Sequence, residues 1–191
     1  MDVKDAIEAR RAYRSLEPVE ITEETIIELA KAAQLAPSCN NNQPWRFVFV
    51  YEPEVLISMR EALSKGNEWI HRASMIIAVI SKKDLDCILP RREFYYAFDT
   101  GMAIGLLMLR ATELGLVAHP IAGFSPKKTR EILGIGDEWD VITLVNVGRK
   151  SPVLNDLLSE SQKERELTRP ERLPLEKFAF RNRFKKEGNE A

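Results

Sequence analysis

A long segment that is apolar on almost every helical face constrains this chain more than any other feature. Residues 93–114 form the longest helical pattern, and from Ala103 to Leu109 nearly all faces are apolar. A helix of this kind must be buried on several sides. Gly115 follows and suits a helix C-cap, because glycine adopts the left-handed conformation without strain. The sequence therefore predicts a folded core built around this helix.

Shorter elements surround the long helix in the sequence. Apolar spacing and capping residues predict further helices over residues 2–13, from the N-cap Thr22 to Ala36, over 53–64, and from Pro126 after the N-cap Ser125. Apolar runs predict a buried strand over 46–51, a central strand over 74–81, and strands over 117–121 and 139–147. Because the connections vary in length, an α+β sheet with helices around it fits better than a regular doubly wound fold.

Composition narrows the class of protein. The chain has 191 residues, 45% hydrophobic and 30% charged, which is typical of one globular domain. Its 28 basic and 29 acidic residues nearly cancel, which argues against nucleic acid as the main partner. The apolar runs are too short to span a membrane, and Cys39 and Cys87 are too few for a disulfide framework. We expect a soluble cytoplasmic protein with reduced thiols and an inert Cys87.

The last part of the chain differs from the rest. Residues 1–150 carry the core pattern, whereas residues 151–191 are rich in charge and proline and end in the basic run 177–186. Such a segment is either a disordered tail or an arm that lies across a partner subunit. In the second case its apolar residues are the anchors: Leu173, Leu175, Phe178 and Phe180.

Several familiar catalytic signatures are absent. The sequence contains neither a G-x-G-x-x-G nor a G-x-x-x-x-G-K-[ST] motif, and His71 and His119 lack a second ligand at metal spacing, so we expect no metal site. Cys39 has no histidine nearby in the sequence, which makes it a poor candidate nucleophile.

Three arginines near the N-terminus form the first candidate site. Arg10, Arg11 and Arg14 can converge on one side of a final helical turn, and guanidinium groups bind phosphate bidentately. The alternative is a solvated basic helix end, which the helix dipole favours.

An amide-rich loop, P-S-C-N-N-N-Q-P-W over residues 37–45, forms the second candidate site. Four consecutive amide side chains between a helix and a strand are either a capped surface turn or a ligand loop. In the second case the alternating donors and acceptors suit a flat heterocycle.

Together these motifs resemble the nitroreductase family of FMN-dependent oxidoreductases. The resemblance rests on R-R-x-x-R, P-S-x-x-N-x-Q-P-W-x-F, G-N at 66–67, D-x-G at 99–101, G-L-x-x-x-x-x-x-G-F at 115–124 and R-x-P-L at 172–175, in this order. It implies a nitroreductase-like α+β fold with a mostly antiparallel central sheet flanked by helices. It also implies a homodimer with two interfacial FMN sites, and a domain-swapped arm over residues 151–191 within the same single domain.

The resemblance assigns roles residue by residue. Arg10, Arg11, Arg14 and Arg172 would hold the FMN phosphate and ribityl chain, and Asn67 would bind the ring carbonyl edge. Ser38, Cys39 and Asn41 would come from the other subunit, with Gln43 and Trp45 orienting and supporting their loop. The backbone of Ala122 and Gly123 would approach flavin N5. The full set of expected cofactor residues is Arg10, Arg11, Ala12, Arg14, Pro37, Ser38, Cys39, Asn41, Gln43, Asn67, Ile121, Ala122, Gly123 and Arg172.

The implied activity is ping-pong transfer of hydride from NADH or NADPH through flavin N5 to a small nitroaromatic or quinone acceptor, with no certain catalytic side chain. Alternatives are flavin-dependent dehydrogenation, reductive dehalogenation, or FMN binding without turnover. Three features depart from the family pattern: Ala12 and Cys39 stand where many relatives have serine, Ala122 replaces an acidic residue, and the lid segment 82–92 is short. Within that segment, Arg91 and Arg92 either select a phosphorylated nicotinamide or lie in a solvated loop.

Overall fold

The protein is built on one five-stranded antiparallel sheet. A computed structural model describes residues 1–91 and 94–184 of the chain. Its strands are β1 (Leu16–Glu17), β2 (Arg46–Val50), β3 (Met75–Ser81), β4 (Val117–Ile121) and β5 (Asp140–Lys150). The order β1-β5-β3-β2 places β5 in the middle, with β4 also paired to it, and every pairing is antiparallel. This confirms the α+β class and the antiparallel sheet.

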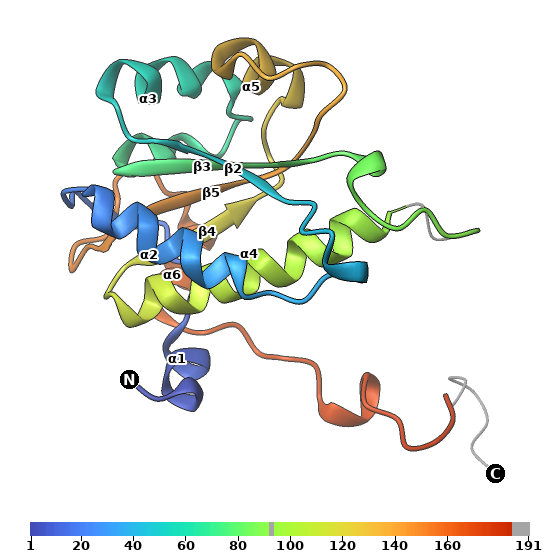
Figure 1. The fold of residues 1–191 in the computed structure, drawn as a ribbon. Helices are drawn as coiled ribbons and strands as arrows, with labels where there is room; N and C mark the ends of the chain where they lie inside the picture. The colour runs from blue at the N-terminus through green and yellow to red at the C-terminus, as the bar shows by residue number, and fades with distance from the viewer. Residues whose placement is uncertain (92–93, 185–191) are drawn as a thin grey trace.

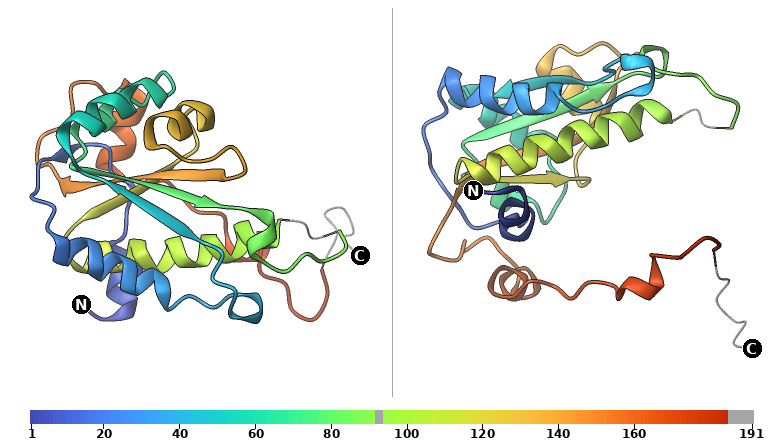
Figure 2. Two further views of the ribbon diagram at one scale, coloured as in Figure 1. Left: turned by 45° about the horizontal axis from the view of Figure 1, so that its top comes forward. Right: turned by 60° about the horizontal axis from the view of Figure 1, so that its bottom comes forward.

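Helices cover both faces of the sheet. They are α1 (Val3–Ala9), α2 (Glu23–Gln34), α3 (Pro53–Met59), α4 (Tyr95–Glu113), α5 (Pro126–Leu133) and α6 (Glu160–Leu167). Figures 1 and 2 show α2 and α4 side by side on one face and α3 and α5 on the other. Strand β3 is buried along its whole length because both of its faces are covered.

Each face has its own apolar core. Leu29 of α2 and Leu107 of α4 pack with Ile77 and Val145 of the sheet. On the opposite face Trp69 packs with Ile76 and with side chains around α3 and α5. The sheet and α2 therefore bury the long helix along one side only. Its other faces are partly or fully exposed in the single chain, from Gly101 to Leu109, so the expected burial on several sides is not met within one chain.

Local sequence signals set most element boundaries. Thr22 and Ser125 cap α2 and α5 as expected, each accepting a hydrogen bond from the backbone three residues later. Gly115, at φ 74°, follows α4 in the left-handed conformation that favours glycine. Strand β2 was expected to be buried, but it lies at the sheet edge, and only Val50 at its end is fully buried. The expected start of the long helix at Glu93 lies outside the described residues.

The C-terminal segment has two parts. Residues 155–168, with α6, pack on their own chain, where Leu158 is 5% and Glu166 is 6% exposed. Residues 169–184 are exposed throughout and extend away from the body beneath α4 (Figure 1, and the right view of Figure 2). The part of the chain that packs on its own core therefore extends to residue 168. The structure does not describe residues 185–191, which include the last two positions of the basic run 177–186.

The expectation of reduced thiols is wrong, because Cys39 and Cys87 form a disulfide. The two residues are 48 positions apart in the sequence. The fold brings them together by placing the loop between α2 and β2 beside the segment that follows β3. No spacing rule could have paired two cysteines so far apart.

None of the helices in the described parts of the chain is long and apolar enough to cross a membrane.

Strand β4 carries a buried histidine beside the N-terminal segment. His119 is 6% exposed, its Nδ1 lies 3.0 Å from the carbonyl oxygen of Tyr13, and its ring stacks on Trp69 with 4.8 Å between centroids. Burial is the main cause that lowers the pKa of His119 to about 4, and the charges of Arg14 and Arg10 act in the same direction. The folded protein therefore holds this ring neutral at pH 7.

His119 makes stability depend on pH. Because the unfolded chain binds a proton near pH 6.5 and the folded chain only near pH 4, the stabilisation is complete above pH 6.5 and is lost as the pH falls. We expect its loss between pH 7 and pH 5 to be about 2 kcal/mol of unfolding free energy. Urea unfolding at both pH values should show a clearly smaller loss for His119→Gln than for wild type. The control His71→Gln should stay closer to wild type than His119→Gln does, because His71 is exposed even though burial and Arg60 also lower its pKa. An equal loss in all three proteins would contradict the assignment.

Candidate active site

The arginine segment is extended in the structure. Helix α1 ends at Ala9, and Arg10 already has φ −56° and ψ 121°. The chain then runs to β1, where Leu16 pairs with Lys150 of β5. The expected final helical turn carrying three arginines is therefore wrong, because pairing with the sheet requires an extended approach.

Arg10 lies in a strongly positive environment. Partial burial, followed by the charges of Arg169 and Arg172, lowers the pKa of Arg10 from its ordinary value. Arg169 itself donates to the carbonyl oxygens of Glu8 and Arg10, which fixes it beside the N-terminal segment. An anion bound here would relieve the repulsion between the guanidinium groups, and a phosphate has the charge and geometry for it.

Arg11 and Arg14 have different environments from Arg10. Arg11 donates through Nη2 to the carbonyl oxygens of Arg165, Glu166 and Thr168, at 2.9, 3.3 and 3.0 Å, and so holds the end of α6. The backbone of Arg14 donates to Glu166 Oε1 at 2.7 Å, and its guanidinium lies 6.0 Å from the Trp69 ring. Burial lowers the pKa of Arg14, which Glu166 partly offsets.

Asn67 and Gly123 are brought together although 56 residues separate them. Asn67 Nδ2 donates to the Gly123 carbonyl oxygen at 2.8 Å, and Trp69 Nε1 donates to Asn67 Oδ1 at 3.2 Å. The Ser64 backbone also donates to the Gly123 carbonyl oxygen at 3.0 Å. Ile121 is buried at the end of β4, whereas the neighbouring Ala122 is exposed. The turn after β4 thus presents its backbone next to an anchored amide.

The amide-rich loop has a fixed and unusual backbone. Asn40, Asn41 and Gln43 have φ of 50°, 57° and 49°, a region that asparagine tolerates better than most residues. Ser38 Oγ accepts from the Gln43 backbone at 3.0 Å, and Gln43 Nε2 donates to the Asn41 carbonyl oxygen at 3.2 Å. Asn41 itself is exposed, while Trp45 is buried beneath the loop in the core. The loop is therefore ordered by its own contacts.

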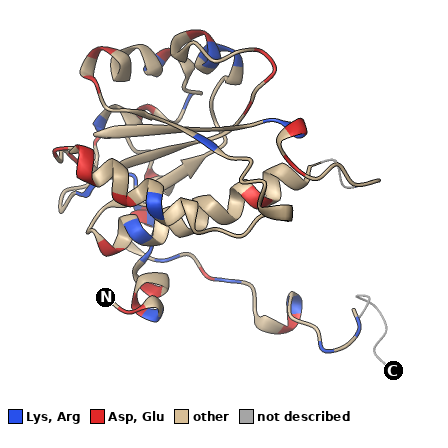
Figure 3. Cartoon of the chain, in the orientation of Figure 1, with Lys and Arg blue, Asp and Glu red and all other residues tan. Residues whose placement is uncertain are grey.

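Within one chain, the amide-rich loop and the N-terminal arginine segment lie at different ends of α4. Figure 1 shows the amide-rich loop beside the N-terminal end of α4 and α1 below its C-terminal part. Between them, a groove of about 520 Å³ runs along α4, lined by Arg10, Pro37 and an uncharged stretch of the helix, Met102–Leu109. Figure 3 shows this middle part of α4 without charge, whereas Lys and Arg recur along the C-terminal segment. Arg172 is exposed in that segment, and Ala12 is exposed in the N-terminal one.

Sequence reasoning missed three residues of this region. Glu166 accepts from the backbones of Arg14 and Ser15, Arg169 lies beside Arg10, and Trp69 joins Asn67 to His119. Arg169 lies three residues before Arg172 of the R-x-P-L motif. This proximity was the one feature of the sequence that could have indicated a role for Arg169 in the site. Glu166 lies in a charged run, where nothing distinguishes a buried carboxylate from a solvated one.

The Asn67–Gly123 contact gives a test of the site's geometry. A Cβ at position 123 would lie 2.4 Å from Asn67 Nδ2, so Gly123→Ala must displace the Asn67 side chain and break its hydrogen bond. We expect a loss of about 1 kcal/mol of unfolding free energy, measured by urea titration. In an Asn67→Ala background the same change should cost much less. The control Gly101→Ala meets no atom within 4 Å and should be neutral or stabilising; equal costs of Gly123→Ala in both backgrounds would refute the contact.

Sequence comparison finds known relatives of this chain. The nitroreductase family model matches residues 7–68 and 55–149. A relative from Archaeoglobus fulgidus with a provisional NADH dehydrogenase/NAD(P)H nitroreductase name is 33% identical over 151 residues, covering 74% of this chain and 82% of the relative. An NADH dehydrogenase of Thermus thermophilus is 28% identical over 178 residues, covering 78% of this chain and 86% of the relative.

The fold is also similar to that of solved structures. A crystal structure of an oxidoreductase containing FMN superposes with a TM-score of 0.81 at 28% identity, covering 97% of this chain and 94% of the other. The matched motifs, the antiparallel sheet and the family model all lead to one conclusion: this chain belongs to the nitroreductase family.

Proposed function

We propose that this protein is an FMN-dependent NAD(P)H oxidoreductase that reduces small electrophilic acceptors of the nitroaromatic or quinone type. The observation that carries the proposal is the environment of Arg10, whose partly buried charge faces Arg169 and Arg172. A site that gathers positive charge in this way is suited to the phosphate of a mononucleotide. Membership of the nitroreductase family makes FMN the mononucleotide to test first.

The residues present fit such a cofactor. Arg10, Arg14 and Arg172 would hold the phosphate. Arg11 instead holds the end of α6. Ala12 is exposed and its small side chain would leave room for the cofactor beside the extended segment. Asn67 and the Ile121–Gly123 turn would face the ring, where a Cβ at Gly123 would collide with Asn67. Pro37, Ser38, Cys39, Asn41 and Gln43 would supply the remaining side of the site from a second copy of the chain.

The chain's own residues would bind and orient the reactants. Bound FMN would supply the hydride-transfer chemistry between a nicotinamide donor and the acceptor. Arg10 would stabilise the negative charge of the reduced ring. His119 stacks on Trp69, and burial lowers its pKa to about 4. Because the ring is neutral at pH 7, His119 would not act as a general acid in the reduction of the acceptor.

A homodimer would complete the site. Phe98 on α4 is 58% exposed, and the groove beside Leu106 and Leu109 is open along the same helix. Leu173 and Phe178 of the C-terminal segment are 69% and 58% exposed. Burying these surfaces against a second copy removes apolar area from water and would join the amide-rich loop of one chain to the arginines of the other.

Cofactor titration followed by reduction tests this function. Protein freed of ligand should bind one FMN per chain, and either NADH or NADPH should bleach the bound flavin in the absence of oxygen. Arg10→Ala should weaken FMN binding about 10- to 100-fold, because a charge-assisted contact of about 1.5–3 kcal/mol is lost. The exposed-charge control Lys127→Ala should bind as wild type. Unchanged affinity in Arg10→Ala would reject its role, and bound FMN that neither nicotinamide reduces would leave a binding protein without turnover.

Shortening the chain tests the arm. Ending the chain after Thr168 keeps α6 and its contacts with Arg11 but removes the exposed segment. We expect this form to remain folded but to sediment as a monomer and to bind FMN at least 10-fold more weakly, since the apolar anchors, Arg169 and Arg172 are all lost. The matched control ends after Phe184 and should behave as the full chain. A dimer of the shorter form with normal FMN affinity would show that the segment is not an intersubunit arm.

A further inference from the structure

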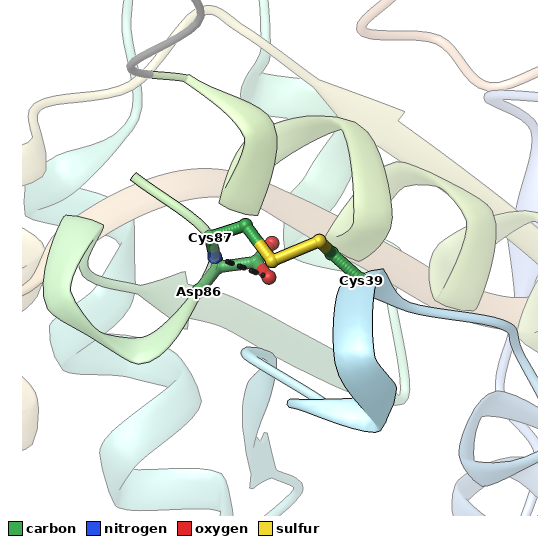
Figure 4. Close-up of side chains that lie close together, drawn as sticks. All are labelled: Cys39, Asp86 and Cys87. Atoms are coloured by element: carbon green, nitrogen blue, oxygen red, sulfur yellow. Dashed lines mark hydrogen bonds between the residues drawn. A yellow bond between two sulfur atoms is a disulfide. The ribbon is translucent and has the colours of Figure 1, made fainter. Parts of the chain in front are cut away.

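The Cys39–Cys87 disulfide lies at the surface, within reach of small molecules. Cys39 begins a 3-10 turn in the amide-rich loop, and Cys87 follows the short turn Lys83–Leu85 after β3. Both cysteines are only partly buried. Figure 4 shows the sulfur atoms bonded to each other next to the Asp86 carboxylate. A small thiol can therefore approach this bond without unfolding the protein.

The two sulfur atoms are not equivalent. Cys87 Sγ accepts hydrogen bonds from Asn40 Nδ2 at 3.5 Å and Asn42 Nδ2 at 3.6 Å. Among the described residues, no asparagine amide donates a hydrogen bond to Cys39 Sγ in the same way. N–H donors stabilise a thiolate, and in thiol–disulfide exchange the better stabilised thiolate is the better leaving group. The loop therefore favours departure of Cys87 and attack at Cys39.

Two buried carboxyl groups hold the backbones of both cysteines. Asp99 Oδ2 accepts from the Cys39 backbone at 2.6 Å, and Asp86 Oδ1 accepts from the Cys87 backbone at 2.8 Å. Asp99 is 1% and Asp86 is 7% exposed. These contacts do not involve the sulfur atoms, so they can persist when the bond between them opens. The two thiols would then stay close enough to re-form the disulfide.

The Asp86 carboxylate also acts on the neighbouring Asp99 carboxyl group. Asp86 Oδ2 and Asp99 Oδ1 are buried without a partner, and two adjacent carboxylates repel each other. Burial first, and then the Asp86 carboxylate, raise the pKa of Asp99. A raised pKa favours the neutral form of Asp99, and a neutral Asp99 reduces the negative charge near the sulfur atoms, which favours a thiolate at Cys87.

We propose that Cys39–Cys87 is a reversible thiol–disulfide exchange site that takes small thiols, which attack Cys39 and expel Cys87. The thiolate of the first small thiol bonds to Cys39 Sγ as the Cys39–Cys87 bond breaks, with the electron pair going to Cys87 Sγ. A second thiolate attacks the small thiol's sulfur in this mixed disulfide and releases Cys39. The protein gains two electrons and, from water, two protons, while two small thiols leave as their disulfide.

Trapping the mixed disulfide tests the direction of attack. The full chain as purified is treated with excess reduced glutathione, quenched in acid, alkylated with N-ethylmaleimide and analysed as peptides by mass spectrometry. We expect glutathione on Cys39 and alkylation on Cys87 at early times, and two alkylated cysteines later. Glutathione on Cys87 would overturn the assigned direction. A disulfide that resists glutathione in the folded chain but not in urea would show a purely structural bond.

Variants of the amide-rich loop test the role of the two asparagine donors. Asn40→Gly with Asn42→Ala should slow reduction measurably, because loss of the N–H donors raises the pKa of the departing Cys87 thiol and a thiol of higher pKa leaves more slowly. The control Gln34→Ala removes an exposed amide on α2 and should leave the rate unchanged. Equal rates in all proteins would reject the role of the loop amides.

An Asp86 carboxylate oxygen and both sulfur atoms lie within 4.8 Å of one another. Stoichiometric zinc binding by the reduced chain that blocks alkylation would therefore replace the exchange site with a metal site. None of these readouts measures flavin reduction, so failure of the exchange site can be distinguished from failure of the proposed FMN chemistry.

Discussion

The pairing of β5 with three other strands is the interaction on which the rest of the structure depends. β3 and β4 lie along its two edges, and β1 extends the ladder at its C-terminal end. The ladder satisfies backbone groups that would otherwise be buried without partners, and it gives both apolar cores a common surface. Because β1 joins this ladder, the N-terminal segment must run past β4, which places Arg14 near Trp69 and Tyr13 near His119. The position of the candidate site is thus a consequence of sheet topology.

Charge is distributed unevenly around that framework. The N-terminal segment and residues 165–172 are held together by Arg11, Glu166 and Arg169, and their association concentrates guanidinium groups around Arg10. Assembling like charges costs free energy in the folded chain, and an anionic ligand would recover it. The same region holds His119 neutral by burial. Positive charge with a neutral ring behind it suits binding of an anion more than proton transfer by a side chain.

The amide-rich loop combines two properties that the sequence shows only separately. Its left-handed residues and internal hydrogen bonds give it a defined shape, and the disulfide and Asp99 attach it to the segment after β3 and to the first turns of α4. The loop proposed to contact the cofactor is thus also the loop whose attachment depends on a covalent bond between sulfur atoms. A change in the oxidation state of this bond would alter the restraint on a single loop and leave the sheet intact.

The sequence by itself determined the elements whose signals are local. The apolar pattern of α4, the caps Thr22 and Ser125 and the apolar strands located most of the fold, and the ordered motifs identified the family. Tertiary structure alone decided what depends on residues far apart in the chain. It placed β2 at the edge, straightened the arginine segment, buried Glu166 and joined Cys39 to Cys87. The physical reason is that propensity and capping act within a few residues, whereas burial, strand pairing and disulfide formation depend on which distant segments the sheet brings together.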